Sequence, residues 1–208
     1  LTAPATGAFS LGNVKSLGMY LPVLWKSIGY SLVSAFICLL LGYPAAYILS
    51  QKQFNTSRTM VVLFILPMWV NILIRTLATV ALFDFLNLPL GEGALVFGMV
   101  YNFLPFMVLP IYNALVKIDN DVISAAQDLG AGQGTILRRI IIPLSIPGIV
   151  SGITMVMVPS ISEFVIASML GGGKVYLIGN VIEQEFTTAN NWYGGAGLSI
   201  VLMILILG

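Results

Sequence analysis

The sequence has no histidine, a single cysteine and little charge, since only 8% of its 208 residues are Asp, Glu, Lys or Arg. The lack of histidine excludes histidine-based metal sites and Ser-His-Asp catalysis. The lone Cys38 excludes an internal disulfide, and its apolar neighbours indicate a small buried hydrophobe. No basic patch with interleaved aromatics indicates nucleic-acid binding. These absences leave few catalytic classes open.

Apolar residues dominate what is present. They make up 58% of the chain, and the mean hydropathy is +0.99. Ordinary globular domains carry roughly 25% charged residues, so this chain has too few to cover a soluble surface. The composition therefore predicts an all-α, polytopic transmembrane helical bundle.

Long apolar stretches give the expected spans, because a helix needs about 20 mainly apolar residues to cross a bilayer. Residues 1–26 contain several Gly and Pro and indicate an interfacial segment instead. We expect a single transmembrane domain over 1–208, cut at its C-terminus before the last span could cross. The expected spans are 28–49, 59–83, 94–116 and 144–170, with a fifth beginning at 195–207.

Basic residues set the expected orientation, because cytoplasmic loops are enriched in Lys and Arg. Lys52 and Arg58 lie in one loop, and Lys117, Arg138 and Arg139 lie in another on the same side by helix parity. These two loops are therefore predicted to face the cytoplasm. The opposite loops carry one basic residue and four acidic ones: Lys174, Asp84, Glu92, Glu183 and Glu185.

Polar residues inside the expected spans are the candidates for a substrate pathway. Arg75 lies one helical turn after Asn71 and is predicted to share its helical face, and Glu163 lies in the outer part of the fourth span. A charge at the bilayer centre costs roughly 2.5–3.5 kcal/mol on insertion scales, so both charges should face the bundle interior, a water-filled cavity or each other. Two interpretations stay open: an ion pair that holds two helices, or a path where Glu163 favours a cation.

Three further residues accompany them. Asn102 is polar within the third span, and Trp69 and Tyr101 could supply cation–π faces or simply pack. Gly148 and Gly152, four residues apart, predict close approach of a neighbouring helix.

No catalytic motif survives inspection. Gly171-Gly172-Gly173-Lys174 superficially suggests a phosphate loop, but Met169 and Val175 occupy positions that need Gly and Ser or Thr. We therefore predict no catalytic residue and no metal site. Any energy for transport must come from another subunit.

The longest polar interruption, 117–143, is predicted to form two short helices. Asp119 or Asn120 can cap a helix over 122–129 that ends at Gly130, and a second piece over 135–142 ends at Pro143. Helices this short are marginal alone. Small residues at 125 and 126 suit insertion into a partner's groove, and an ordinary amphipathic loop is the alternative.

Within this stretch, Ser124-Ala125-Ala126, Gly130, Ile140, Ile142 and Pro143 resemble the Glu-Ala-Ala…Gly…Ile-x-Leu-Pro signature of ABC importer permeases. Ser124 stands at the family's usual Glu and Ile142 at its Leu, and Asp128 could partly substitute for that Glu. The resemblance implies that 117–143 is a coupling loop that docks into a cytoplasmic ATPase. The implied coupling residues are Ser124, Ala125, Ala126, Asp128, Gly130, Ile140 and Pro143.

Other short motifs resemble the spermidine/putrescine importer permease family, in particular the first of its two homologous permeases. They are residues 41–44, 66–69, 73–75, 104–107 and 177–180. The resemblance implies a type I permease fold with six spans, of which the first would precede residue 1.

The same resemblance implies the setting of the protein. The chain would lie in the cell (inner) membrane, surrounded by lipid and paired with a second permease. Two copies of an ATPase that binds ATP and Mg²⁺, and an extracellular polyamine-binding protein, would complete the assembly. This chain would hold no cofactor itself and would move polyamines inward by alternating access. Importers of another small solute, such as an anion or a metal chelate, and a passive channel or membrane anchor are the alternatives.

Overall fold

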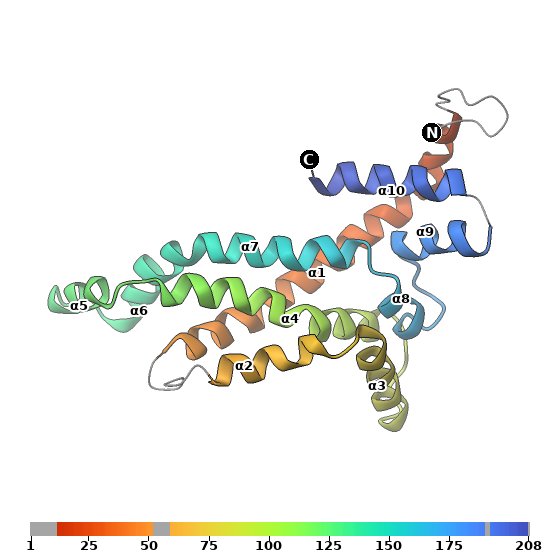
Figure 1. Ribbon diagram of the computed structural model, residues 1–208. Coiled ribbons are helices and arrows are strands. Elements are labelled where there is room, and N and C mark those ends of the chain that lie inside the picture. The colour runs from red at the N-terminus through yellow and green to blue at the C-terminus, as the bar shows by residue number, and fades with distance from the viewer. Residues whose placement is uncertain (1–11, 52–58, 190–191, 208) are drawn as a thin grey trace. The chain divides into compact units, whose positions relative to one another are not determined.

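The computed structural model describes residues 12–51, 59–189 and 192–207, and within these every regular element is a helix (Figure 1). The expectation of an all-α chain is confirmed for these residues. Lys52 and Arg58, which support the predicted orientation, lie outside them. The elements are α1 (Gly12–Ser50), α2 (Thr59–Ile65), the 3₁₀ turn η1 (Leu66–Trp69), α3 (Ile72–Phe85), α4 (Glu92–Val116), α5 (Asn120–Asp128), α6 (Gln133–Ile136), the π-helical turn η2 (Leu137–Ile141), α7 (Ile142–Ile161), α8 (Val165–Leu170), α9 (Ile178–Thr187) and α10 (Trp192–Leu207).

The chain divides into two compact units, and the division cuts across helices. Unit 1 comprises the described parts of 1–32, 73–99 and 158–208, and unit 2 comprises those of 33–72 and 100–157. Connections 86–91 and 171–177 therefore belong to unit 1, whereas the stretch around α5 and α6 belongs to unit 2. Loops that helix parity assigns to the same side are thus grouped in the same unit.

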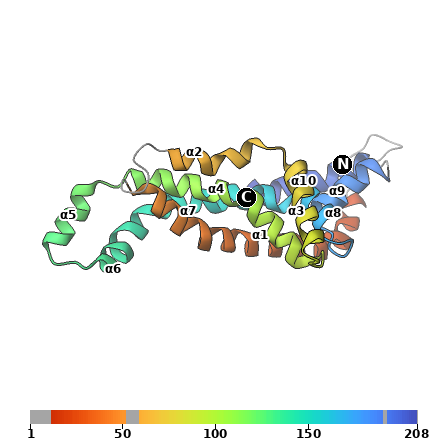
Figure 2. The same ribbon diagram turned by 90° about the horizontal axis from the view of Figure 1, so that it is seen from below.

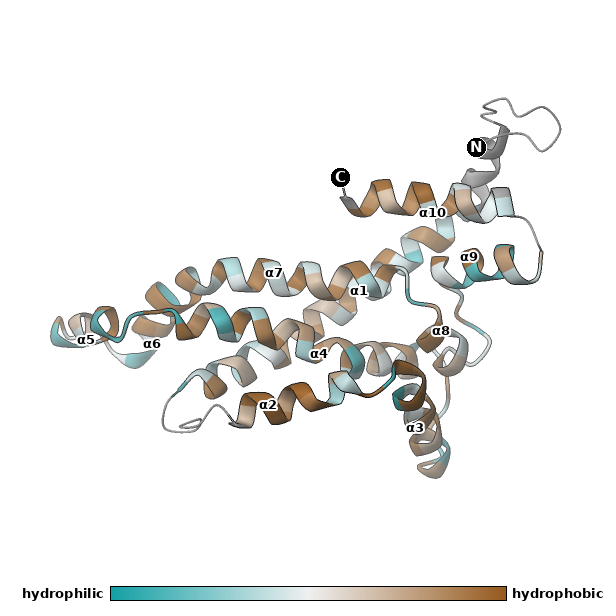
Figure 3. Cartoon of the chain, in the orientation of Figure 1, coloured by the Kyte–Doolittle hydropathy of each residue, from teal (hydrophilic) through white to brown (hydrophobic). Residues whose placement is uncertain are grey.

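Three helices of the described chain are long and apolar enough to cross a membrane: Tyr20–Ser50, Glu92–Val116 and Gln133–Ile161. A broken pair, Met60–Trp69 and Ile72–Phe85, would make a fourth if it counts as one span. In Figure 3, α2 and α10 are mostly hydrophobic, whereas α5 carries hydrophilic residues. The expected third span is confirmed, and it begins two residues earlier than predicted, at Glu92.

The N-terminal stretch corrects one expectation. Residues 1–26 were predicted to be interfacial, yet α1 is already helical from Gly12 and continues through Pro22. A proline removes one backbone donor and does not by itself end a membrane helix, because neighbouring groups can compensate. The first span is therefore longer at its N-terminal side than hydropathy indicates.

The second expected span is interrupted. Pro67 lies within the 3₁₀ turn η1, and Val70 then adopts an extended conformation (φ −82°, ψ 135°) before α3 begins at Ile72. Asn71 precedes α3, so the prediction that Asn71 and Arg75 share a helical face is wrong. Pro67 lies in the first turn of η1, a position at which proline is tolerated.

Glycine brings two helices of unit 2 into close contact, as α7 runs along the C-terminal part of α4 (Figures 1 and 2). A Cβ atom on Gly148 would lie 2.6 Å from Ala114 Cβ and 2.7 Å from Pro110 O. One on Gly152 would lie 2.8 Å from Met107 Sδ. The predicted small-residue contact is confirmed, and at Gly148 the nearby Pro110 carbonyl leaves no room for a larger side chain.

Unit 1 contains two short helices, α8 and α9, that hydropathy did not predict. The expected fourth span, 144–170, ends instead at Ile161, and the chain turns before the short helix α8. Gly98 of α4 faces α8, where its Cβ would collide with Leu170 and Ile166 side chains. Gly91 N donates to Leu170 O at 2.9 Å. These contacts fix the end of α8 against the start of α4.

Candidate functional site

The predicted coupling loop contains a capped, exposed helix. Asp119 is the N-cap of α5, and its side chain accepts a hydrogen bond from Asp121 N at 3.1 Å. The helix ends at the predicted place, because Gly130 adopts φ +79°, which favours glycine. None of the residues of α5 is buried. Asp119 is therefore the cap that sequence reasoning expected.

The predicted coupling residues all lie in unit 2 and are largely accessible. Ser124, Ala125, Asp128, Gly130 and Pro143 are exposed, and Ala126 and Ile140 are half-buried. Leu129, at the C-terminal end of α5, leaves 88% of its surface exposed. A docking role for these residues stays a prediction.

The second short piece of the loop differs from expectation. A helix over 135–142 was predicted to end at Pro143, but helical structure runs from Gln133 through α6, η2 and α7 to Ile161. In an α-helix the Pro143 ring would clash with the carbonyl four residues earlier, at Arg139. The wider π-helical turn at Leu137–Ile141 directly precedes this proline. It allows the helix to continue, so the loop joins α7 without a break.

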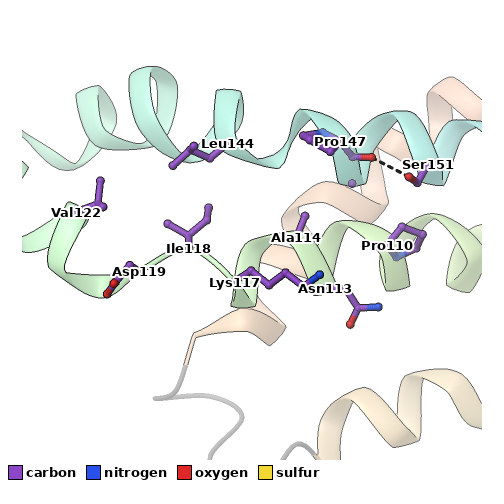
Figure 4. Close-up of a pocket in the computed structure, with 11 residues that line it drawn as sticks. Pro110, Asn113, Ala114, Lys117, Ile118, Asp119, Val122, Leu144, Pro147 and Ser151 are labelled. Atoms are coloured by element: carbon purple, nitrogen blue, oxygen red, sulfur yellow. Dashed lines mark hydrogen bonds between the residues drawn. The ribbon is translucent and has the colours of Figure 1, made fainter.

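A groove of about 610 Å³ lies between α7 on one side and the end of α4 with the start of α5 on the other (Figure 4). In Figure 4, Ile118 and Val122 point toward the same space as Leu144 from α7. Its walls are mainly apolar, with Lys117 and Asp119 among the polar exceptions. The groove keeps α5 apart from the span that follows it. The lining residues are Pro110, Asn113, Ala114, Lys117, Ile118, Asp119, Val122, Leu144, Pro147, Gly148 and Ser151.

The pathway candidates are divided between the two units. Trp69, Asn71, Tyr101 and Asn102 belong to unit 2. Trp69 is 86% exposed and Tyr101 44% exposed, whereas Asn102 is only 2% exposed. Exposure of the two aromatic rings fits either lipid contact or a pathway wall. Their role in substrate passage stays a prediction.

Arg75 and Glu163 both belong to unit 1, and both are buried. Glu163 lies in the break between α7 and α8, where its Oε1 accepts from Val165 N at 2.8 Å and Ile166 N at 3.1 Å. The carboxylate thereby caps the first turn of α8, where negative charge is favoured. Glu163 thus has a structural role that sequence reasoning missed. Its pairing with Arg75 stays a prediction.

The motif Leu177-Ile178-Gly179-Asn180 holds this break in place. Asn180 Oδ1 accepts from Leu177 N at 3.1 Å, while its Nδ2 donates to Phe164 O at 3.0 Å. Ile178 N donates to Ser27 Oγ of α1 at 2.8 Å. A Cβ on Gly179 would collide with the Ser162 carbonyl. The motif therefore joins α1, α9 and the α7–α8 connection.

The described residues include no group of three or more His, Cys, Asp or Glu side chains that could hold a metal ion. A smaller polar cavity of about 230 Å³ lies in unit 1 and includes Tyr176 and Glu183. Neither residue was a sequence candidate, because both lie in a connection outside the expected spans. The excess of acidic residues in the predicted outer loops was the one feature of the sequence that indicated a residue such as Glu183.

Comparison with known proteins gives a family and relatives. The family described as binding-protein-dependent transport system inner membrane component matches residues 13–208. The spermidine/putrescine transport system permease protein PotB of Haemophilus influenzae is 38% identical in an alignment that covers 90% of this chain and 72% of that protein. PotB of Escherichia coli is 37% identical in an alignment that covers 95% of this chain and 79% of that protein.

Among solved structures, a chain of the inward-facing MetNI methionine ABC transporter matches with a TM-score of 0.75 at 19% sequence identity. The match covers 93% of this chain and 92% of that chain. At this identity the likeness concerns the fold, and it agrees with the arrangement of helices described above. The names of the relatives leave assignment to the first of two permeases as a prediction.

Proposed function

Because the chain belongs to the family of binding-protein-dependent transport system inner membrane components, we propose that it is the permease subunit of an ATP-driven polyamine importer. Its fold is that of the type I ABC importer permeases. The polyamine assignment depends on one observation. Relatives 37–38% identical over at least 90% of this chain are named spermidine/putrescine permeases.

The permease would not work alone. The proposed assembly contains a second homologous permease, two copies of an ATPase that bind ATP and Mg²⁺, and an extracellular polyamine-binding protein. The exposed, capped helix α5 supports a coupling role, because a marginal helix with apolar exposed side chains needs a partner to pack against. Ser124, Ala125, Ala126, Asp128 and Gly130 would contact the ATPase. Pro143 and Ile140 would transmit its movement to α7.

Alternating access would then follow from the position of α5. Closure of the ATPase dimer moves α5, and the continuous helix Gln133–Ile161 carries that movement into the membrane. This chain's own residues supply rigidity at two points. One is the glycine contact between α7 and α4, and the other is the backbone-bonded Glu163 at the end of α7. ATP hydrolysis takes place on the partner.

The test is substrate-stimulated ATPase activity of the reconstituted assembly in proteoliposomes. Spermidine or putrescine, delivered by the binding protein, should raise the hydrolysis rate, whereas small anions should not. Stimulation by anions but not by polyamines would overturn the substrate assignment.

Replacement of 120–128 with a Gly/Ser linker tests the coupling role. The ATPase should no longer co-purify, although the permease remains in the membrane at the wild-type level. Retained ATPase binding would refute the coupling role of α5.

A further inference from the structure

A glycine turn shapes one wall of the small cavity in unit 1. Gly172 and Gly173 adopt φ of +60° and +69°. A Cβ on Gly172 would lie 2.9 Å from Leu90 O. The positive φ favours glycine at both positions, and the close approach of Leu90 O also leaves no room for a side chain at Gly172. The motif that fails as a phosphate loop thus shapes part of a cavity.

The cavity has a volume of about 230 Å³ and presents acceptors to whatever enters it. Glu183 contributes a carboxylate, and the Thr187 hydroxyl lies 3.0 Å from its Oε1, which limits its rotamers. The described lining contains no Lys or Arg, and Lys174 of the same turn is not part of it. The lining residues are Ala167, Ser168, Gly173, Val175, Tyr176, Asn180, Glu183, Gln184 and Thr188.

Hydrogen bonds between the Asn180 side chain and the backbone support this lining. Asn180 is buried. Its side-chain amide oxygen accepts a hydrogen bond from Leu177 N, and its amide nitrogen donates one to Phe164 O. Tyr176 is 58% exposed and Glu183 is exposed. The floor of the cavity is therefore fixed, while an aromatic ring and a carboxylate remain accessible at its mouth.

We propose that this cavity is an outer subsite for one primary ammonium group of a polyamine and the methylenes next to it. The inference rests on the proposed function. An ammonium has three donors and no acceptor, which matches a lining of carboxylate, amide and hydroxyl oxygens. The Tyr176 ring offers a cation–π face, and Val175 and Ala167 suit methylene groups.

Size and position indicate what the subsite does. Sites that enclose drug-sized ligands have roughly 300–1,000 Å³, so this cavity receives one end of a polyamine. By helix parity in the sequence, the connection 171–177 is predicted to face the outside, where a binding protein would release its load. Salt screens a solvent-exposed carboxylate, so Glu183 would bind an ammonium group weakly. Weak binding suits transfer of the substrate and not its storage.

The test uses the complete assembly in proteoliposomes with saturating, polyamine-loaded binding protein. Glu183→Gln removes the charge but retains an acceptor for Thr187. Its maximal transport rate should fall roughly threefold to tenfold, since a charge-assisted hydrogen bond is lost. Tyr176→Ala should also lower the rate, whereas Tyr176→Phe, which keeps the ring, should not. Asp84→Asn, an exposed acidic residue of unit 1 outside the cavity, is the matched control.

Each outcome is decisive. If the wild-type assembly does not transport polyamines, the proposed function fails. If it does, and Glu183→Gln and Tyr176→Ala transport at the wild-type rate, the subsite alone is refuted. If the variants raise only the half-saturating concentration of loaded binding protein, Glu183 and Tyr176 contact that protein and the subsite is again refuted. Co-purification of all subunits confirms that each variant assembles.

Discussion

Removal of the Asp119 cap should weaken coupling between the ATPase and the permease. α5 has only nine residues, none of them buried, whereas isolated helices need roughly 12–15 residues to be even marginally stable. Its stability before docking therefore depends strongly on the hydrogen bond from Asp121 N to Asp119. Loss of an N-cap costs about 1 kcal/mol. That cost lowers the ratio of helical to non-helical α5 about fivefold.

The assay is polyamine-stimulated ATP hydrolysis by the reconstituted assembly, with the ATPase concentration varied. Asp119→Ala should reduce coupling by up to about fivefold, with a weaker apparent affinity for the ATPase, because α5 must fold as it docks. Asp119→Asn is the matched control, since Asn caps as well as Asp. Equal activity of Asp119→Ala and wild type would refute the reasoning. Equal loss in Asp119→Ala and Asp119→Asn would show that the charge matters and the cap does not.

Three other predictions concern stability and transport. Gly148→Leu should lower the midpoint of thermal unfolding in detergent and cost at least about 1–3 kcal/mol, because the new side chain meets Ala114 Cβ and the Pro110 carbonyl; an unchanged midpoint would contradict the packing of α4 on α7. Ser27→Ala should cost about 1–3 kcal/mol by leaving a buried backbone donor of α9 without its acceptor, and Ser27→Thr should cost less by the same measurement. Glu163→Gln should preserve assembly but slow polyamine uptake, whereas Glu163→Ala should also lose about 0.5–2 kcal/mol of stability with the α8 cap; wild-type uptake in Glu163→Gln would remove this residue from the pathway.

Hydropathy and local residue chemistry predict the features that neighbouring residues determine. Neighbouring residues alone determine three correctly predicted features: the span that forms α4, the Asp119 cap and the end of α5 at Gly130. The contact at Gly148 follows from the small residue itself, although the sequence does not identify its partners on α4.

The failures have tertiary causes. The helical path breaks just after Pro67, whereas it continues through Pro105, Pro110 and Pro143, so a proline alone does not decide where a helix ends. Hydropathy does not predict helices α8 and α9 because both are too short to cross a membrane. α9 in particular is held by side chains distant in sequence, such as Ser27. No local window contains that information.

Glu163 shows that a charge in an apolar sequence can have a structural role as well as a predicted functional one. An intramembrane carboxylate indicates a functional site by default, and a cationic substrate made Glu163 an attractive candidate. The structure gives its Oε1 two backbone donors at the break after α7. Glu183 is exposed, beside an aromatic ring and without a basic residue in the described lining. Polyamine capture needs a carboxylate that can exchange water for ammonium at little cost, which an exposed group does more readily than a buried cap. Glu183 is therefore expected to meet the substrate first, while Glu163 keeps rigid the joint at which α7 ends.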